Sequence, residues 1–216
     1  MQNSPRPEPQ ASAAAGGAPP ATTPAGTVPA TPAPGAPADG APSPSRVRLV
    51  LIGPPGAGKS TVGRLAARAL GVGLLDTDEE VERTAGRTIS EIFIDSGEDT
   101  FRALEHEAVT RALAEHDGVL ALGGGAVLHP GTQAALAGMP VVFLDVSMAK
   151  ALKRVGLAGA RPLLVDSPRA RWKALMDARR GTYERVATAV VSTDGLRPEE
   201  VARAALAAVE AEGAPS

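Results

Sequence analysis

Cysteine is absent from this chain of 216 residues, so disulfide bonds and cysteine-ligated zinc sites are excluded. No apolar run approaches the roughly 18 residues that span a bilayer, which argues against a membrane protein. A strong excess of one charge is also missing, because 22 basic residues are balanced by 24 acidic ones. This balance does not favour nucleic acid or an anionic membrane as a partner. We therefore expect a soluble, cytoplasmic protein that works as a monomer.

The first 45 residues differ in composition from the rest of the chain. They hold 12 of the 20 prolines, and alanine, glycine, serine and threonine fill most other positions. A segment with so few large apolar side chains cannot bury enough surface to offset its ordering entropy, so we predict a disordered tail over residues 1–45. It has neither the apolar core of a signal peptide nor the Arg-rich pattern of a transit peptide. Residues 46–216 are long enough for one domain with its own core.

Short apolar segments typical of buried strands alternate with helical patterns after the tail. The predicted strands cover residues 47–52, 73–76, 118–122, 140–145 and 189–191. The clearest helical patterns cover residues 100–115, 168–186 and 198–210. This alternation predicts an α/β fold with three layers, in which helices cover both faces of a five-stranded parallel sheet. Ligands of such sheets bind at the carboxyl ends of the strands, so the residues there are candidates for function.

The segment Gly53–Thr61 reads GPPGAGKST and fits the phosphate-binding pattern G-x-x-x-x-G-K-[ST]. An apolar strand precedes it and a helical pattern follows it, so backbone N–H groups and a helix N-terminus would point at a polyphosphate. Lys59 would add a positive charge beside the phosphates, and Ser60 would place its hydroxyl on Mg²⁺. The alternatives are weaker: a plain turn, or a dinucleotide loop, in which Thr61 stands where a third glycine or alanine belongs. The predicted nucleotide-binding residues are Gly56, Ala57, Gly58, Lys59, Ser60 and Thr61.

The second predicted strand ends in Asp76-Thr77-Asp78. In an extended chain, carboxylates two residues apart point the same way, and these two would face the phosphate loop. One would orient Mg²⁺ through its water shell, while the other would accept a proton from an attacking hydroxyl or hold that hydroxyl in line. The alternative is an ordinary acidic helix start with Asp78 as the N-cap. These residues alone leave both interpretations open.

Three consecutive glycines, Gly123, Gly124 and Gly125, follow the third predicted strand. Bare backbone directly after a buried strand favours the close approach of a ligand over a merely flexible turn.

Three arginines are candidates for binding anions. Arg102 lies at the start of a long helical pattern, Arg179 lies late on another, and Arg161 lies in a glycine-containing stretch between helices. A mobile lid over residues 155–168 that carries a guanidinium would neutralise phosphate charge and exclude water. Each arginine taken alone is more often a solvated surface residue, and spacing does not show whether the three converge.

Several motifs in a fixed order make the chain resemble the shikimate kinases from residue 47 to about residue 212. These motifs are Gly53–Thr61, Leu75-Asp76-Thr77-Asp78, Ile89-x-x-Ile92-Phe93, Gly97-Glu98-x-x-Phe101-Arg102-x-x-Glu105, Leu120–Ala126 and Arg161-Pro162-Leu163-Leu164. The run from Arg102 through Glu105 to the triple glycine is the most diagnostic, because a phosphate loop alone fits many families. The resemblance implies a P-loop kinase with a mobile lid. It also implies ATP-dependent phosphorylation of the 3-hydroxyl of shikimate, in the route to chorismate and the aromatic amino acids.

The resemblance further implies a role for each matching residue. It places Lys59 on the phosphates, Ser60 on Mg²⁺ and Asp76 in the outer shell of the metal. It places Asp78 on the substrate hydroxyls as a base or orienting group. Glu105 would hold Arg102. The remaining implied roles are the shikimate carboxylate for Arg102 and Arg179, the shikimate ring for Gly123, Gly124 and Gly125, lid closure for Arg161, and the adenine for Arg154, Arg197 and Pro198.

Two other functions compete with this interpretation. A gluconate-type or nucleoside-monophosphate kinase would share the architecture, but the acceptor-side motifs, all present and in order, argue against it. A nucleotide-dependent binding module that has lost catalysis is the second alternative. The complete set of residues expected for phosphoryl transfer argues against that module.

Overall fold

The computed structural model describes residues 47–156 and 168–212 of the chain. The predicted tail over residues 1–45 lies outside this range, and so does the predicted lid except for its ends at residues 155–156 and 168. Both therefore stay predictions. Within the part of the chain that is described, no helix has the length and apolar character needed to cross a bilayer.

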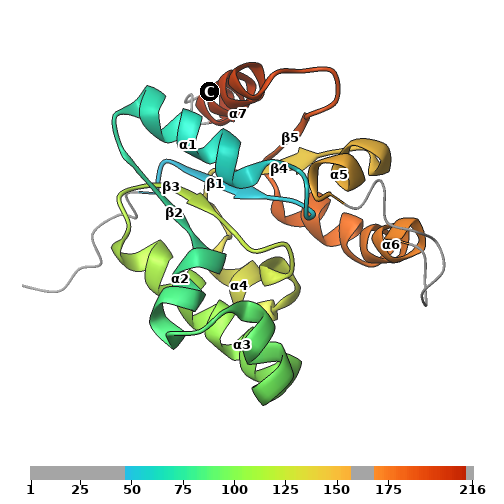
Figure 1. Ribbon diagram of the computed structural model, residues 1–216. Coiled ribbons are helices and arrows are strands. Elements are labelled where there is room, and N and C mark those ends of the chain that lie inside the picture. Colours follow the sequence, from blue (N-terminus) through green and yellow to red (C-terminus); the bar gives the residue numbers. More distant parts are fainter. Residues whose placement is uncertain (1–46, 157–167, 213–216) are drawn as a thin grey trace, which may run out of the picture. The chain divides into compact units, whose positions relative to one another are not determined.

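Five parallel strands form one sheet, as the sequence predicts (Figure 1). The strands are β1 Leu49–Ile52, β2 Gly73–Asp76, β3 Gly118–Ala121, β4 Val141–Asp145 and β5 Ala189–Ser192. Their order in the sheet is β2-β3-β1-β4-β5, so the strand before the phosphate loop lies in the centre. The predicted strand ends differ from the observed ones by at most two residues. The α/β fold class is therefore confirmed.

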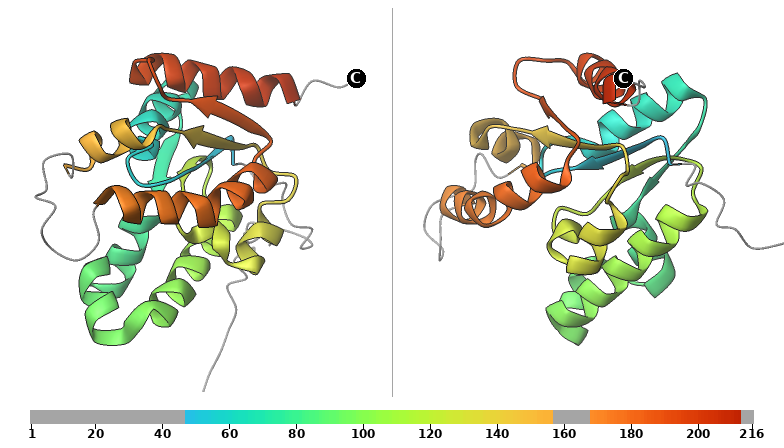
Figure 2. Two further views of the ribbon diagram at one scale, coloured as in Figure 1. Left: turned by 90° about the vertical axis from the view of Figure 1, so that its right-hand side faces the viewer. Right: turned by 180° about the vertical axis from the view of Figure 1, so that it is seen from behind.

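Helices cover both faces of the sheet (Figure 2). The helices are α1 Lys59–Leu70, α2 Thr77–Ala85, α3 Ile89–Glu115, α4 Pro130–Ala135, α5 Met148–Arg154, α6 Pro168–Val186 and α7 Pro198–Glu212, with a 3-10 helix η1 at Ala126–Leu128. Helices α1 and α7 pack on one face, whereas α3 and α6 contribute to the core on the other. The three predicted layers are thus present.

Strand β1 shows why the strands read as continuous apolar runs. Its side chains alternate between the faces: Val50 and Ile52 join the core on the α3 and α6 side, and Leu49 and Leu51 join the core on the α1 and α7 side. All four are at most 1% exposed. A strand buried on both faces needs apolar residues at every position, which is typical of parallel sheets.

The structure adds helices that the sequence pattern did not reveal. Three of them, α2, α4 and α5, are short, and α3 begins well before the predicted helix. A capping box starts α3, because the Thr88 side chain accepts from the Glu91 N–H at 3.2 Å and the Glu91 side chain accepts from the Thr88 N–H at 2.7 Å. Gly97, with a φ of 80°, then breaks the helix. This break separates the first turns from the longer part that carries Arg102.

All five strands run the same way, so their carboxyl ends lie at one edge of the sheet. The phosphate loop follows β1, Asp76 ends β2, and the triple glycine follows β3 by one residue. The central order β3-β1-β4 places the triple glycine beside the phosphate loop. This edge therefore brings together segments that are far apart in the sequence.

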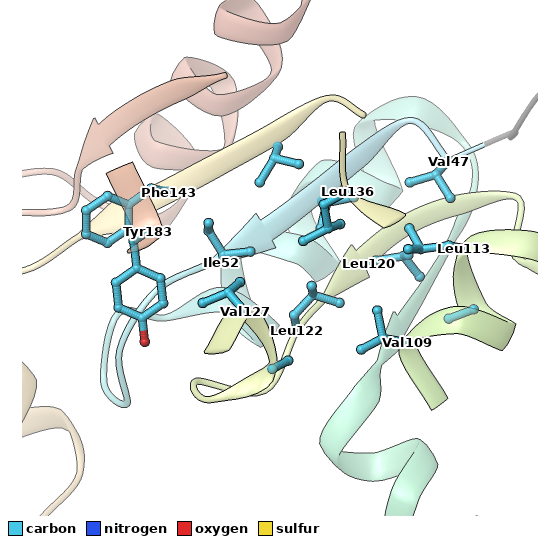
Figure 3. Close-up of a cluster of buried hydrophobic side chains, with 14 of the residues drawn as sticks. Val47, Ile52, Val109, Leu113, Leu120, Leu122, Val127, Leu136, Phe143 and Tyr183 are labelled. Carbon is cyan, nitrogen blue, oxygen red and sulfur yellow. The ribbon is translucent and has the colours of Figure 1, made fainter. Parts of the chain in front are cut away.

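Leu120 belongs to the apolar core on the α3 and α6 side of the sheet (Figure 3). It is completely buried and stands opposite Val50 of β1 and Leu75 of β2 in the sheet register. The core therefore fixes the strand that leads into the triple glycine.

We predict that Leu120→Ala lowers the free energy of unfolding by about 2–5 kcal/mol, because it removes buried methyl groups and leaves a cavity. Urea unfolding measures the change. The matched control is Val190→Ala on the edge strand β5, where the side chain is 54% exposed, and its effect should stay below about 1 kcal/mol. Equal losses for the two variants would contradict the assignment of Leu120 to the core.

Candidate active site

The phosphate loop joins β1 to α1 and places the N-terminus of α1 at the carboxyl edge of the sheet (Figure 1). Gly56 has a φ of 82°, and a Cβ atom there would lie 2.7 Å from the carbonyl oxygen of Ala151 in α5. Gly58 is the N-cap of α1, with a φ of 93° and no side-chain cap. The first N–H groups of α1 are therefore open to an anion, as the motif predicts.

Lys59, the first residue of α1, is folded back over the loop. Its Nζ atom donates hydrogen bonds to the carbonyl oxygens of Gly53, at 2.9 Å, and Pro54, at 3.4 Å. Burial lowers the pKa of Lys59, whereas the nearby carboxylates of Asp78 and Asp76 act in the opposite direction. The ammonium group thus lies between the phosphate loop and the two aspartates.

Ser60 and Asp76 form a pair of oxygen ligands suited to a hard cation. The Ser60 hydroxyl donates to Asp76 Oδ2 at 2.6 Å, which links α1 to the end of β2. In proteins, Mg²⁺ keeps several waters and binds through one or two carboxylates together with substrate phosphates. A hydroxyl and a carboxylate beside a phosphate loop match this donor set. The residues present therefore fit the predicted ion.

The sequence suggested either an extended chain through Asp76 and Asp78 or a helix capped by Asp78. The start of α2 has neither of these local geometries. Asp76 Oδ1 accepts a hydrogen bond from the Asp78 N–H at 3.1 Å, so Asp76 is the N-cap and the alternative with Asp78 as N-cap is wrong. Thr77 is already helical, so the two carboxylates do not extend from one stretched strand. The physical reason is that Asp76 satisfies an N–H group that the helix start leaves unpaired. Asp78 instead lies in the first turn of α2.

Asp78 is a carboxyl group whose surroundings disfavour its ionised form. Burial raises the pKa of Asp78 to about 6, Asp76 and Glu105 add to the rise, and Lys59 opposes it. General bases work best when their pKa lies near the pH of the reaction. A pKa in this range suits Asp78 to accepting a proton near neutral pH.

The triple glycine makes room for charged side chains at the end of β3. A Cβ atom at Gly123 would overlap the carboxylates of Asp78 and Glu105. A Cβ atom at Gly125 would overlap the guanidinium group of Arg102. The bare backbone therefore admits three charged groups from α2 and α3 at once, and any larger residue would displace them.

Two glutamates hold Arg102. Its Nη1 atom donates to Glu105 Oε2 at 2.6 Å, and its Nη2 atom donates to Glu98 Oε1 at 3.0 Å. Glu105 is 2% exposed, and burial raises its pKa, whereas the hydrogen bond from Arg102 opposes that shift. The structure thus contains the contact through which Glu105 was expected to hold Arg102.

Arg179 reaches the same glycines from α6. Its Nη1 atom donates to the carbonyl oxygen of Gly124 at 3.0 Å. Arg102 lies against Gly125 and Asp78 lies against Gly123, so these three side chains from different helices meet at the triple glycine. Their sequence spacing gave no sign of this convergence.

Other residues join the site without having been singled out in the sequence. The Thr77 hydroxyl accepts from the Gly123 N–H at 2.9 Å, and the Thr193 hydroxyl accepts from Arg154 Nη1 at 3.2 Å. Tyr183 donates its hydroxyl hydrogen to the Gly124 carbonyl. The sequence offers one weak signal for Tyr183, which is its position one helical turn after Arg179.

Two pockets along the phosphate loop suit a nucleotide. One, of about 300 Å³, is lined by Gly56, Gly58, Lys59, Ser60, Thr61 and Arg154. The second, of about 250 Å³, shares three of these residues and is also lined by Ala57, Val62, Thr193, Leu196, Pro198 and Val201. Arg154 joins the two, because its Nη1 atom donates to the carbonyl oxygens of Gly56 and Ala57 as well as to Thr193. A polar pocket at the loop therefore continues into a more apolar one.

Two predicted nucleotide contacts are not placed in these pockets. Arg197 does not line either of them. It lies directly before α7, where its Nη2 atom pairs with Glu200 Oε1 at 3.3 Å. Arg161 lies outside the described residues. Their proposed roles stay predictions.

Comparisons with known proteins agree with this geometry. The family model described as shikimate kinase matches residues 55–210. The chain is 60% identical to the shikimate kinase of Streptomyces coelicolor over 162 residues, which cover 75% of this chain and 95% of that protein. It is also 60% identical to the shikimate kinase of Thermobifida fusca over 158 residues, with coverages of 73% and 92%.

Solved structures give the same result. A shikimate kinase from Acinetobacter baumannii in complex with shikimate superposes with a TM-score of 0.71 at 34% identity, covering 77% of this chain and 94% of that one. The shikimate kinase from Aquifex aeolicus superposes with a TM-score of 0.63 at 36% identity, with coverages of 76% and 97%. This chain therefore belongs to the shikimate kinase family.

Proposed function

We infer that this protein is a shikimate kinase, which transfers the γ-phosphoryl group of ATP to the 3-hydroxyl of shikimate. The observation that carries this inference is the convergence of Asp78, Arg102 and Arg179 on the Gly123–Gly125 backbone. Gly124 in turn lies against the phosphate loop, because a Cβ atom there would lie 3.3 Å from Pro55. A site for a small anion thus adjoins a site for phosphates.

The acceptor site matches the chemistry of shikimate, a small ring with one carboxylate and three hydroxyls. Guanidinium groups bind carboxylates through paired hydrogen bonds, so we assign Arg102 and Arg179 to the carboxylate. Asp78 would receive the hydroxyl that attacks the phosphate. The bare backbone of Gly123–Gly125 would let the ring lie close to the sheet edge.

The donor site would bind ATP along the phosphate loop. The N–H groups from Gly56 to Thr61 would hold the phosphates, with Lys59 adding a positive charge that offsets the charge of the transferred group. We assign a magnesium ion to Ser60 and Asp76, which would hold it so that it neutralises phosphate charge. Arg154 and Pro198 line the pockets in which the rest of the nucleotide would lie.

Transfer would then depend mainly on positioning and on charge stabilisation. Asp78 would hold the attacking oxygen in line with the phosphate and accept its proton. Lys59 would stay on the phosphates throughout. We assign Arg161 to the closure of a lid over residues 155–168, and Arg197 to the neighbourhood of the adenine. The monomeric state and the cytoplasmic location also belong to this proposal.

Turnover with ATP, magnesium and shikimate should release ADP only when shikimate is present. The physical reason is that the acceptor site holds two arginines and one carboxyl for a small carboxylate with hydroxyls. Coupled measurement of ADP release tests this, with omission of magnesium as one control. Faster turnover with gluconate or a nucleoside monophosphate, or no response to shikimate, would contradict the proposed function.

Arg102→Lys should raise the KM for shikimate roughly tenfold, because an ammonium group cannot replace the paired hydrogen bonds of a guanidinium. Lysine keeps a positive charge beside the buried Glu105, so the fold is expected to survive. The matched control is Arg87→Lys, whose side chain pairs with Asp95 at 3.6 Å on the surface. Steady-state kinetics for both substrates decide the point, and an unchanged KM for shikimate would remove Arg102 from the carboxylate site.

Asp78→Asn should stabilise the fold at pH 8 while slowing turnover. Because the pKa of Asp78 is raised from 3.8 to about 6, ionisation of this group weakens the folded state progressively between these values and fully above them. The variant should therefore gain about 1 kcal/mol in the free energy of unfolding at pH 8, a figure reduced for partial exposure. Urea unfolding at pH 8 and pH 5 should show a smaller gain at pH 5. Glu79→Gln, at an exposed neighbour, is the control, and equal gains at the two pH values would refute the raised pKa.

A further inference from the structure

Tyr183 is a buried aromatic residue with a polar end directed at the acceptor site. It is 0% exposed, and its ring stacks on Phe143 of β4 with the centroids 5.0 Å apart (Figure 3). Its hydroxyl donates to the carbonyl oxygen of Gly124. Burial raises the pKa of Tyr183, so this hydroxyl keeps its proton and remains a donor at neutral pH.

The part of α6 that carries Tyr183 is fixed to the sheet. Arg180 binds the carboxylate of Asp145, at the end of β4, through two hydrogen bonds of 2.7 and 3.2 Å. Its guanidinium also lies 5.8 Å from the centre of the Phe143 ring. Paired arginine–carboxylate bonds add geometric specificity, so the register of α6 on β4 is well defined. The Tyr183 hydroxyl therefore has little freedom to move.

Arg179 donates to the same carbonyl oxygen, at 3.0 Å, but its situation is different. It is a long side chain that is only half-buried, and it reaches Gly124 from the side of the acceptor site. A carbonyl oxygen has two lone pairs, so it can accept from Tyr183 and Arg179 together. One acceptor thus has a fixed donor and a movable donor.

The difference matters once a substrate carboxylate competes for Arg179, a step that rests on the function proposed above. If Arg179 were the sole donor, its departure would leave the half-buried Gly124 carbonyl without a protein partner, and losing a hydrogen bond there is unfavourable. With Tyr183 in place, the carbonyl keeps one hydrogen bond when Arg179 leaves, so the release of Arg179 costs less.

We propose that Tyr183 is a positioning residue for shikimate binding, whose hydroxyl holds the Gly124 carbonyl and so leaves Arg179 free to bind the substrate carboxylate. Tyr183 does not touch the substrate in this scheme. It acts through Gly124 and Arg179.

The test is Tyr183→Phe, which removes one oxygen atom and keeps the ring that stacks on Phe143. The KM for shikimate should rise about three- to tenfold, the range expected for one hydrogen bond, and the KM for ATP should change less than twofold. Thr182→Val removes a hydroxyl at the neighbouring position and should leave both values unchanged. Equal increases for the two substrates, or no increase for shikimate, would overturn the proposal.

A double-mutant cycle tests whether Tyr183 acts through Arg179. In the background of Arg179→Met, Tyr183→Phe should have no further effect on the KM for shikimate, because the movable donor is already gone. The same factor in both backgrounds would overturn the proposal.

The same experiments separate this inference from the proposed function. If the wild type shows no shikimate-dependent turnover, or if Arg179→Met leaves the KM for shikimate unchanged, the proposed function itself fails at that point. If the wild type responds to shikimate and Arg179→Met raises the KM for shikimate, but Tyr183→Phe leaves that KM unchanged, the inference alone fails.

Discussion

The absence of side chains at Gly123–Gly125 is the constraint on which the rest of the site depends. Asp78 and Glu105 occupy the space that a side chain at Gly123 would fill, and Arg102 occupies the space at Gly125. Gly124 offers its carbonyl oxygen to Arg179 and Tyr183. A stretch of bare backbone at the end of a central strand thus becomes the meeting point of α2, α3 and α6. A side chain at Gly123 would displace Asp78 and Glu105, and one at Gly125 would displace Arg102.

The charged groups around this backbone shift one another's pKa values. Burial disfavours the ionised forms of Asp78, Glu105 and Lys59, and each finds partial compensation in its neighbours. Glu105 is paired with Arg102, while Lys59 and Asp78 act on each other. An arrangement of this kind is less stable than an apolar core would be, and it holds charged groups where a phosphate and a carboxylate would bind.

Much of the fold could be predicted from the sequence because its signals are local. Buried strands appear as apolar runs, and the long helices α6 and α7 have clear periodicity, so their positions were predicted to within a few residues. The short helices were missed, since α2 and α4 each bury few side chains and depend on contacts made after folding. The start of α2 was misjudged for a related reason. Asp78 was considered as the N-cap, and only the hydrogen bond that the Asp78 N–H donates to Asp76 Oδ1 identifies Asp76 in that position.

The sequence by itself determined the phosphate loop, the parallel sheet and the list of candidate residues, because each rests on residues that are close together in the chain. The spacing of the candidates did not show which of them meet, and the tertiary structure decided that. It brought Asp78, Arg102 and Arg179 to one backbone segment and added Thr77 and Tyr183 to them. It left Arg197 exposed just before α7. The reason is that such contacts depend on how helices pack against a common sheet edge, and sequence spacing carries no measure of that distance.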